Sequence, residues 1–464
     1  SFLCLIFSFV ISDFSNETVF NNSHTTKPLF YKISGTWGNH EGSLLLWLLV
    51  LTLFIFLFIA RTKNQPVKYK ILTLVFQQII IVGFFLFLIL TSNPFNYIFP
   101  TPTEGLGLNP ILQDPALAIH PPILYLGYVG SSIIFSSVLA ATSLKIISTS
   151  WAIHIKKWTL ISWIFLTLGI LLGSIWAYYE LGWGGFWFWD PVENVSLMPW
   201  LALTTLLHCI LVLEKKSILT SWVIILSIAT FTLSMCGTFL VRSGILNSVH
   251  TFANDPSRGL FILIFLAFMI SMSLIILFKY FPNEKNNFLF LSKESFVLFN
   301  NWFMIFFLTV VLIGTLYPLF LEVLSKEKVS VGPAYYNIVL APFIVPFLFL
   351  MSYGPQSKWF SSKLVDVKKM FFIILLSFSL VFIFANFEKD SSFITTLILV
   401  FSIYLILQSF LDLYTSIKNN SFNLSRSISH LGFGMLIFFI STNNILSTES
   451  NFNLKVGETK KLTN

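Results

Sequence analysis

The sequence predicts an all-α fold, a polytopic transmembrane helical bundle of about 12 helices with a tryptophan-rich loop on its outer side. Two observations lead to this prediction. Of the 464 residues, 56% are hydrophobic and only 10% are charged, whereas an ordinary soluble domain has about 25% charged residues. Uncharged apolar stretches recur from end to end, and many reach the roughly 17 to 25 residues that a helix needs to cross a bilayer.

The apolar stretches can be placed one by one. They do not alternate as barrel strands do, and backbone polar groups in lipid must be satisfied within each segment, so they are expected to be helices. No long polar linker separates them, so residues 1–464 are expected to form a single integral membrane domain. The apolar run 2–11 is too short to span, which leaves a trimmed signal, a truncated helix or an interfacial piece open. We expect spans near 44–60, 71–91, 123–141, 158–178, 195–213, 219–241, 259–281, 302–321, 334–353, 370–387, 392–413 and 427–443.

The basic residues indicate topology. The net charge is +8, but the Lys and Arg residues gather in the short loops between spans, so the expected partner is a lipid membrane and not nucleic acid. When the loops are assigned alternately, 18 of the 28 Lys and Arg residues fall on one side, which the positive-inside rule makes the cytoplasmic or matrix side. The loops 92–122, 179–194 and 242–258 then face outward, and the first two contain no Lys or Arg.

The second outer loop contains an aromatic run, with five aromatic residues among the seven from 183 to 189. An interfacial aromatic belt is the ordinary explanation, but a belt needs neither glycines nor a run this dense. Trp and Phe rings side by side make a broad apolar platform, and adjacent glycines let the backbone approach a bulky ligand. The pattern therefore predicts a platform for a macrocycle, formed by Trp183, Gly184, Gly185, Phe186, Trp187 and Trp189 and followed by Asp190.

Two histidines flank this loop on the outer side. His120 precedes Pro121-Pro122 at the outer end of one span, and His250 lies in the third outer loop. Two neutral imidazoles are the usual axial ligands of a porphyrin iron that is held without covalent attachment. Position alone leaves surface hydrogen bonding open as the alternative. The three cysteines form no C-x-x-C-H pattern, so the chain has no covalent haem site of its own.

Two more histidines, His208 and His430, lie inside spans. A polar side chain in lipid is costly and usually has a functional partner. Both lie roughly 5–8 Å below the same inner surface at the helical rise, so they can face each other. Hydrogen bonding of each ring to a neighbouring helix is the alternative.

These motifs resemble those of a known family. The aromatic run is similar to the tryptophan-rich WWD signature of haem-handling membrane proteins, and its continuation Asp190-Pro-Val-Glu-Asn-Val-Ser-Leu-Met-Pro-Trp resembles the version in the cytochrome c maturation haem lyase family, CcmF. The strings around the four histidines and Trp37-Gly-Asn-His-Glu-Gly are also similar to that family, in the same order, from about residue 37 to 435. Phe186 departs from the signature, which has Trp there, and so lacks an indole N–H donor.

The resemblance implies a haem lyase subunit of cytochrome c maturation, whose catalysis is largely positioning. Haem would be the substrate on the outer platform, ligated by His120 and His250 while it is attached through thioether bonds to apocytochrome c. A second haem, a resident haem b on His208 and His430, would pass electrons outward from a donor such as quinol. The further partners implied are a haem chaperone and thiol-reducing maturation subunits.

Other expectations concern location and the remaining histidines. The 53 Phe residues and the many Ile and Asn residues are typical of an AT-rich organellar genome. They favour the mitochondrial inner membrane, with the haem loops facing the intermembrane space, over a bacterial plasma membrane. We expect a hydrogen-bonding role for His40 and solvated loop positions for His24 and His154. The alternative function is a haem-binding structural or transporter-like subunit of a respiratory membrane assembly.

Overall fold

The computed structural model is almost entirely helical in the part that it describes. A single antiparallel bridge, between Asn16 and Tyr97, is the only extended pairing within that part. The chain falls into two compact units: the first comprises residues 1–288 and 301–337, and the second comprises 289–300 and 338–464. The single membrane domain expected from the sequence stays a prediction. The described residues are 1–181, 185–243, 256–282, 288–325, 329–362, 366–385, 392–419, 424–447 and 452–461.

The helices follow the apolar stretches of the sequence. In the first unit they are α1 (Phe2–Ile11), α2 (Glu17–Asn22), α3 (Leu29–Gly35), α4 (His40–Arg61), α5 (Val67–Thr91), η1 (Pro110–Leu112), α6 (Pro115–Tyr128), α7 (Ser131–Ser143), α8 (Thr149–Glu180), α9 (Pro191–Lys215), α10 (Thr220–Arg242) and α11 (Pro256–Lys279). Residues of both units belong to α12 (Lys293–Ser325) and α13 (Pro333–Tyr353). The second unit continues with η2 (Gly354–Gln356), α14 (Val367–Ala385), α15 (Phe393–Lys418) and α16 (Leu424–Leu446).

The predicted fold class is confirmed. Eleven helices of the described chain are long and apolar enough to cross a membrane, and α14 covers most of the remaining expected span, 370–387. One expected span, 123–141, is made by two consecutive helices, α6 and α7. The two helices meet at Val129 and Gly130, and Pro121 and Pro122, whose nitrogens cannot donate, lie inside α6.

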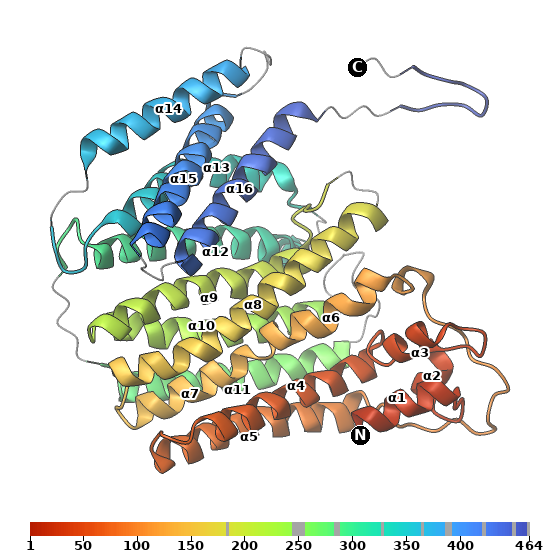
Figure 1. Cartoon of the computed structure of the whole chain (residues 1–464). Coiled ribbons are helices and arrows are strands. Elements are labelled where there is room, and N and C mark those ends of the chain that lie inside the picture. The colour runs from red at the N-terminus through yellow and green to blue at the C-terminus, as the bar shows by residue number, and fades with distance from the viewer. Residues whose placement is uncertain are drawn as a thin grey trace. The chain divides into compact units, whose positions relative to one another are not determined.

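The first unit gathers its short N-terminal helices at one end of its long helices. In Figure 1, α1 to α3 gather where α4 begins and α5 ends. Asn16 Nδ2 donates to Pro94 O at 3.0 Å, and the backbone N–H of Leu106 donates to Phe20 O at 2.8 Å. These bonds tie α2 to the loop that follows α5, so this loop is a folded part of the unit.

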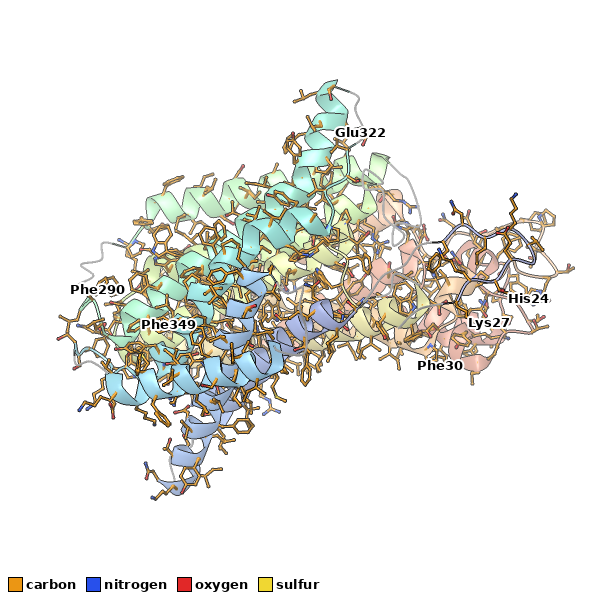
Figure 2. All side chains as sticks on the ribbon, turned by 90° about the horizontal axis from the view of Figure 1, so that it is seen from above. His24, Lys27, Phe30, Phe290, Glu322 and Phe349 are labelled. Carbon is orange, nitrogen blue, oxygen red and sulfur yellow. The ribbon has the colours of Figure 1, made fainter. Side chains whose placement is uncertain are left out.

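Hydrogen bonds also fix charged side chains between α2 and α3 and in the loop after α5. Figure 2 shows His24 and Lys27 close together on the first of these segments. Glu104 accepts from the backbone N–H of Thr25 at 2.9 Å and from its hydroxyl at 2.5 Å, and these bonds lower the pKa of the Glu104 carboxyl to about 2. Lys27 donates to Asn22 O at 3.2 Å. Burial, and next the charge of Lys32, lower the pKa of Lys27 to about 8.

An ion pair joins the last two helices of the second unit. Arg426, in the first turn of α16, donates to both carboxylate oxygens of Asp412 on α15, each at 2.7 Å, and the hydroxyl of Ser427 donates to the same carboxylate at 2.6 Å. A bidentate pair of this kind fixes geometry as well as adding energy. It sets the position of the helix start that leads to His430.

Candidate functional site

His120 lies against two glycines of α8. Its Nδ1 is 2.7 Å from the carbonyl oxygen of Gly169, and because a carbonyl can only accept, Nδ1 carries the proton of the neutral ring. A Cβ added at Gly173 would lie 2.8 Å from His120 Cε1, and one at Gly169 would lie 2.6 Å from Leu124 Cα. The Gly-x-x-x-Gly pattern therefore provides the surface on which α6 packs and on which the imidazole rests.

This contact fixes the tautomer and the orientation of the His120 ring. A metal-ligating histidine almost always donates its other N–H to a carbonyl or carboxylate, which sets the tautomer and the ring orientation. With the proton on Nδ1, the lone pair of His120 is on Nε2. The outer end of α6 is also joined to α8, since Tyr179 donates its hydroxyl hydrogen to Asp114, the N-cap of α6, at 2.6 Å. His120 thus lies on α6 close to the helix that leads into the aromatic loop.

The aromatic loop is organised by the start of α9. Asp190 is the N-cap, and Glu193 completes a capping box by accepting from the N–H of Asp190 at 3.0 Å. The same Glu193 oxygen accepts from the N–H of Phe188, also at 3.0 Å. Trp189 between them has φ 58°, a left-handed conformation that is costly for a bulky residue. The polar half of the motif therefore holds its aromatic half in an otherwise unfavourable shape.

The predicted platform residues are described only in part. Trp183 and Gly184 lie outside the described residues. The rings of Trp187 and Trp189 meet edge to face, with centroids 6.0 Å apart. Phe186 is 37% exposed, so its ring faces out of the protein core. The assignment of these residues to haem stays a prediction.

A residue that the sequence did not assign to the site, Tyr336, completes the aromatic cluster. Its ring stacks on Trp189 with centroids 4.3 Å apart and an interplanar angle of 9°. Asn194 donates through Nδ2 to both Trp189 O and the Tyr336 hydroxyl, each at 3.0 Å. Tyr336 belongs to the string Gly332-Pro-Ala-Tyr-Tyr-Asn337. This string is so far from Trp189 in the chain that their contact cannot be inferred from one sequence.

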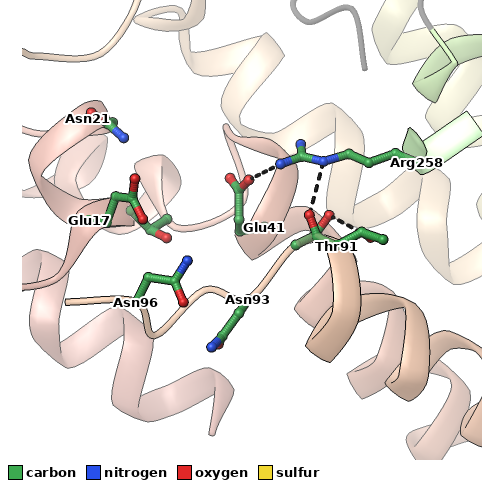
Figure 3. Close-up of a pocket in the computed structure, with 9 residues that line it drawn as sticks. Glu17, Asn21, Glu41, Thr91, Asn93, Asn96 and Arg258 are labelled. Carbon is green, nitrogen blue, oxygen red and sulfur yellow. Dashed lines mark hydrogen bonds and ion pairs between the residues drawn. The ribbon is translucent and has the colours of Figure 1, made fainter. Parts of the chain in front are cut away.

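The first residues of α4 bind Arg242 and Arg258, the two arginines on either side of residues 244–255 in the sequence. His40 Nδ1 lies 2.6 Å from Arg242 Nη1, and because a guanidinium only donates, His40 is the acceptor. The hydrogen-bonding role expected for His40 is confirmed. The next residue, Glu41, forms an ion pair with Arg258 at 2.9 Å, and Arg258 also donates to Thr91 O at 3.2 Å (Figure 3).

Arg242 ends α10, and Arg258 lies in the first turn of α11. His250 falls between them, outside the described residues, and its role as a ligand stays a prediction. The pair of Glu41 and Arg258 borders a polar cavity of about 180 Å³ whose lining includes Glu17 and Asn96 (Figure 3). His40 and Glu41 of the Trp37 string therefore bind Arg242 and Arg258, which lie on either side of residues 244–255 in the sequence.

His208 and His430, the two histidines expected inside spans, both lie on helices. His208 on α9 has its Nδ1 2.8 Å from the carbonyl oxygen of Thr204, so its neutral ring, like that of His120, carries its lone pair on Nε2. His430 lies six residues after the start of α16, and His208 lies seven before the end of α9. Each therefore lies about two turns from one end of its own helix. They belong to different units, and their pairing stays a prediction.

One minor expectation is wrong. His154 is not a solvated loop residue, because α8 begins at Thr149 and continues through the lysines at 156 and 157. Its ring packs against Phe58 with centroids 5.4 Å apart, and its Nε2 is buried without a hydrogen-bond partner among the described atoms. His24 does lie in a loop, 2.9 Å from the hydroxyl of Thr26.

Comparison with known proteins agrees with this arrangement. The family model described as "Cytochrome C assembly protein" matches residues 37–246. The chain is 52% identical over 369 residues to the cytochrome c-type biogenesis protein CycK of Bradyrhizobium diazoefficiens, covering 79% of this chain and 56% of the relative. It is 41% identical over 481 residues to the cytochrome c-type biogenesis protein CcmF of Haemophilus influenzae, covering 100% of this chain and 74% of the relative.

A solved structure named "Cytochrome c Heme Lyase CcmF" matches with a TM-score of 0.78 and 27% identity, over 96% of this chain and 68% of that one. The chain thus spans between about half and three quarters of the length of these relatives. The match extends over both units of the fold and includes the aromatic loop and its flanking helices. The chain belongs to the CcmF family of cytochrome c-type biogenesis proteins.

Proposed function

We propose that this multi-pass membrane protein is a haem lyase subunit of cytochrome c maturation, which holds haem on its outer face for attachment to apocytochrome c. The observation that supports the proposal most directly is the setting of His120. Its Nδ1–H is engaged by a backbone carbonyl, and its ring rests in a cradle that a Cβ at Gly173 would fill. Such a ring is oriented to coordinate through Nε2 before any ligand arrives.

The substrates supply the reacting groups. Each thioether forms when a cysteine S–H of apocytochrome c adds across a vinyl C=C of haem: the sulfur bonds one carbon and the hydrogen goes to the other. The chain would contribute position, with His120 and His250 on the iron and Trp187 and Trp189 against the ring. Holding two bulky reactants in the right geometry lowers a barrier without a chemical group of the enzyme's own.

We further propose that His208 and His430 hold a resident haem b within the membrane. The chemistry of each residue fits the group, since His208 donates Nδ1–H to Thr204 O and so keeps its lone pair on Nε2, and His430 lies one turn after Arg426, which Asp412 fixes. A bound haem b would supply one-electron transfer, and quinol is the donor class we propose. A haem chaperone and thiol-reducing subunits are the further partners that the proposal requires.

For location, we propose the mitochondrial inner membrane, with the haem loops in the intermembrane space. The support is the residue composition, with 53 Phe in 464 residues. The curated relatives named above are bacterial, so the bacterial plasma membrane is the alternative. Mapping the gene to an organellar or a bacterial genome decides between the two.

The function is tested by substituting histidines one at a time in cells whose cytochrome c maturation depends on this protein. His120→Ala should abolish haem-stained cytochrome c while the purified protein keeps a b-type spectrum, and His208→Ala should remove that spectrum. His24→Ala, at an exposed loop, is the matched control and should change neither. Normal cytochrome c in His120→Ala would refute the outer site, and an unchanged b-type spectrum in His208→Ala would refute the inner one.

A further inference from the structure

The stack of Tyr336 on Trp189 is close, and its tyrosine ring is buried. The two rings are nearly parallel, at 9° and 4.3 Å between centroids, and Tyr336 is only 1% exposed. Tyr336 lies in the first turn of α13, whereas Trp189 lies in the loop before α9. A contact between residues so far apart in the chain is a tertiary restraint on the loop, in addition to its local capping bonds.

Trp189 needs such a restraint. Its left-handed backbone, φ 58°, persists only where the surroundings impose it. Three groups do so: Glu193 binds the N–H groups on both sides of it, Asn194 binds its carbonyl, and Tyr336 covers its ring. Asn194 is 1% exposed, and its Nδ2 donates to both the Trp189 carbonyl and the Tyr336 hydroxyl. One side-chain amide therefore holds the Trp189 backbone and the Tyr336 ring.

The fold leaves room for a tyrosine at this position. A Cβ at Gly314 on α12 would lie 2.6 Å from the hydroxyl oxygen and 2.8 Å from Cζ of Tyr336. Since distances under 3.0 Å are essentially never seen for real Cβ atoms, any larger residue at 314 would displace the phenol ring. A glycine in the middle of a membrane helix thus accommodates the far end of the Tyr336 side chain.

We propose that Tyr336 is a positioning residue of the haem platform, which fixes the plane of the Trp189 ring and thereby the plane in which the porphyrin stacks. The inference rests on the proposed function and adds to it a residue on a helix remote from the aromatic motif. Tyr336 acts through Trp189 and is not itself a ligand. Its aromatic face carries most of the effect, and its hydroxyl, which accepts from Asn194, carries the remainder.

The test is a difference titration of hemin into the purified full-length chain in detergent, followed in the Soret band. Tyr336→Leu should raise the dissociation constant of the His120-dependent site by roughly two- to tenfold, the range expected for losing one aromatic pair. Tyr336→Phe keeps the stack and should stay closer to wild type than Tyr336→Leu. Tyr317→Leu is the matched control, because Tyr317 lies on α12, the helix that carries Gly314, and is 49% exposed. This variant should leave the hemin dissociation constant unchanged.

A double-mutant cycle separates positioning from general destabilisation. If Tyr336 acts through Trp189, then Tyr336→Leu should have little further effect in a Trp189→Leu background, whereas independent effects would add. Suppose first that His120→Ala loses hemin binding at the outer site. Then additive effects in the cycle, or a hemin dissociation constant in Tyr336→Leu equal to that of wild type, overturn the role of Tyr336 but leave the proposed function standing. If His120→Ala binds hemin as wild type does, the proposed outer site fails first, and this inference fails with it.

Discussion

Gly173→Ala should damage the outer site while leaving the helix that carries it intact. The new Cβ would lie 2.8 Å from His120 Cε1, 3.2 Å from Nδ1 and 3.3 Å from Nε2, whereas ordinary contacts begin at 3.4 Å. Three ring atoms are too close, so the imidazole must move as a whole, by about 0.6 Å at its nearest atom. That movement strains or breaks its 2.7 Å hydrogen bond to Gly169 O, and losing such a partner of a metal ligand typically costs about 10- to 100-fold in affinity.

The assay is the same hemin titration, with His120→Ala as the reference for a lost site. Replacing a helical glycine by alanine favours the helix by roughly 1 kcal/mol, which offsets the roughly 1 kcal/mol that the weakened hydrogen bond costs, so the variant should unfold near the wild-type temperature. Gly432→Ala, on α16, is the matched control because nothing lies within 4 Å of its added Cβ. Wild-type hemin affinity in Gly173→Ala would refute the placement of His120 on α8.

Substitutions of Glu193, His40 and Lys27 test three further contacts of the first unit. Glu193→Ala removes the acceptor of two loop N–H groups and should lower stability by about 1–3 kcal/mol, so an unchanged melting midpoint would contradict the capping role. His40→Asn keeps an acceptor for Arg242 and should support cytochrome c maturation better than His40→Ala, and equal yields would count against that role. The folded state disfavours protonated Lys27, with its pKa lowered from 10.5 to about 8, so stability should rise between pH 8 and 10.5. Lys27→Met should flatten that rise in a pH series of unfolding midpoints, and an equal slope in both proteins would exclude Lys27 as its source.

The sequence predicts the membrane fold well because long apolar runs have few other solutions in lipid. All twelve expected spans coincide with helices, but the helix ends were less predictable. α8 starts at Thr149, nine residues before the expected span, because an apolar count stops at charged residues whereas the helix does not. His154 was misplaced for this reason.

The site could be predicted as far as residue types and chain order allow. The chemistry of the Trp-rich run and the histidines predicts a porphyrin site, but one sequence does not show which residues distant in the chain are in contact. Tyr336 on Trp189 and Arg242 on His40 join residues far apart in the chain. Gly169 and Gly173 are four residues apart in the sequence, but only the structure shows that His120 packs against them.

The stack between Trp189 and Tyr336 also has a consequence for biosynthesis. The bonds from Glu193 and Asn194 to the aromatic loop are local and can form as soon as α9 has been made. Tyr336 lies 142 residues beyond Asn194, so its ring reaches Trp189 only after α13 has entered the membrane. Because a chain emerges from its N-terminus, this contact forms late, and a nascent chain that ends before α13 has the aromatic loop without the ring that stacks on Trp189.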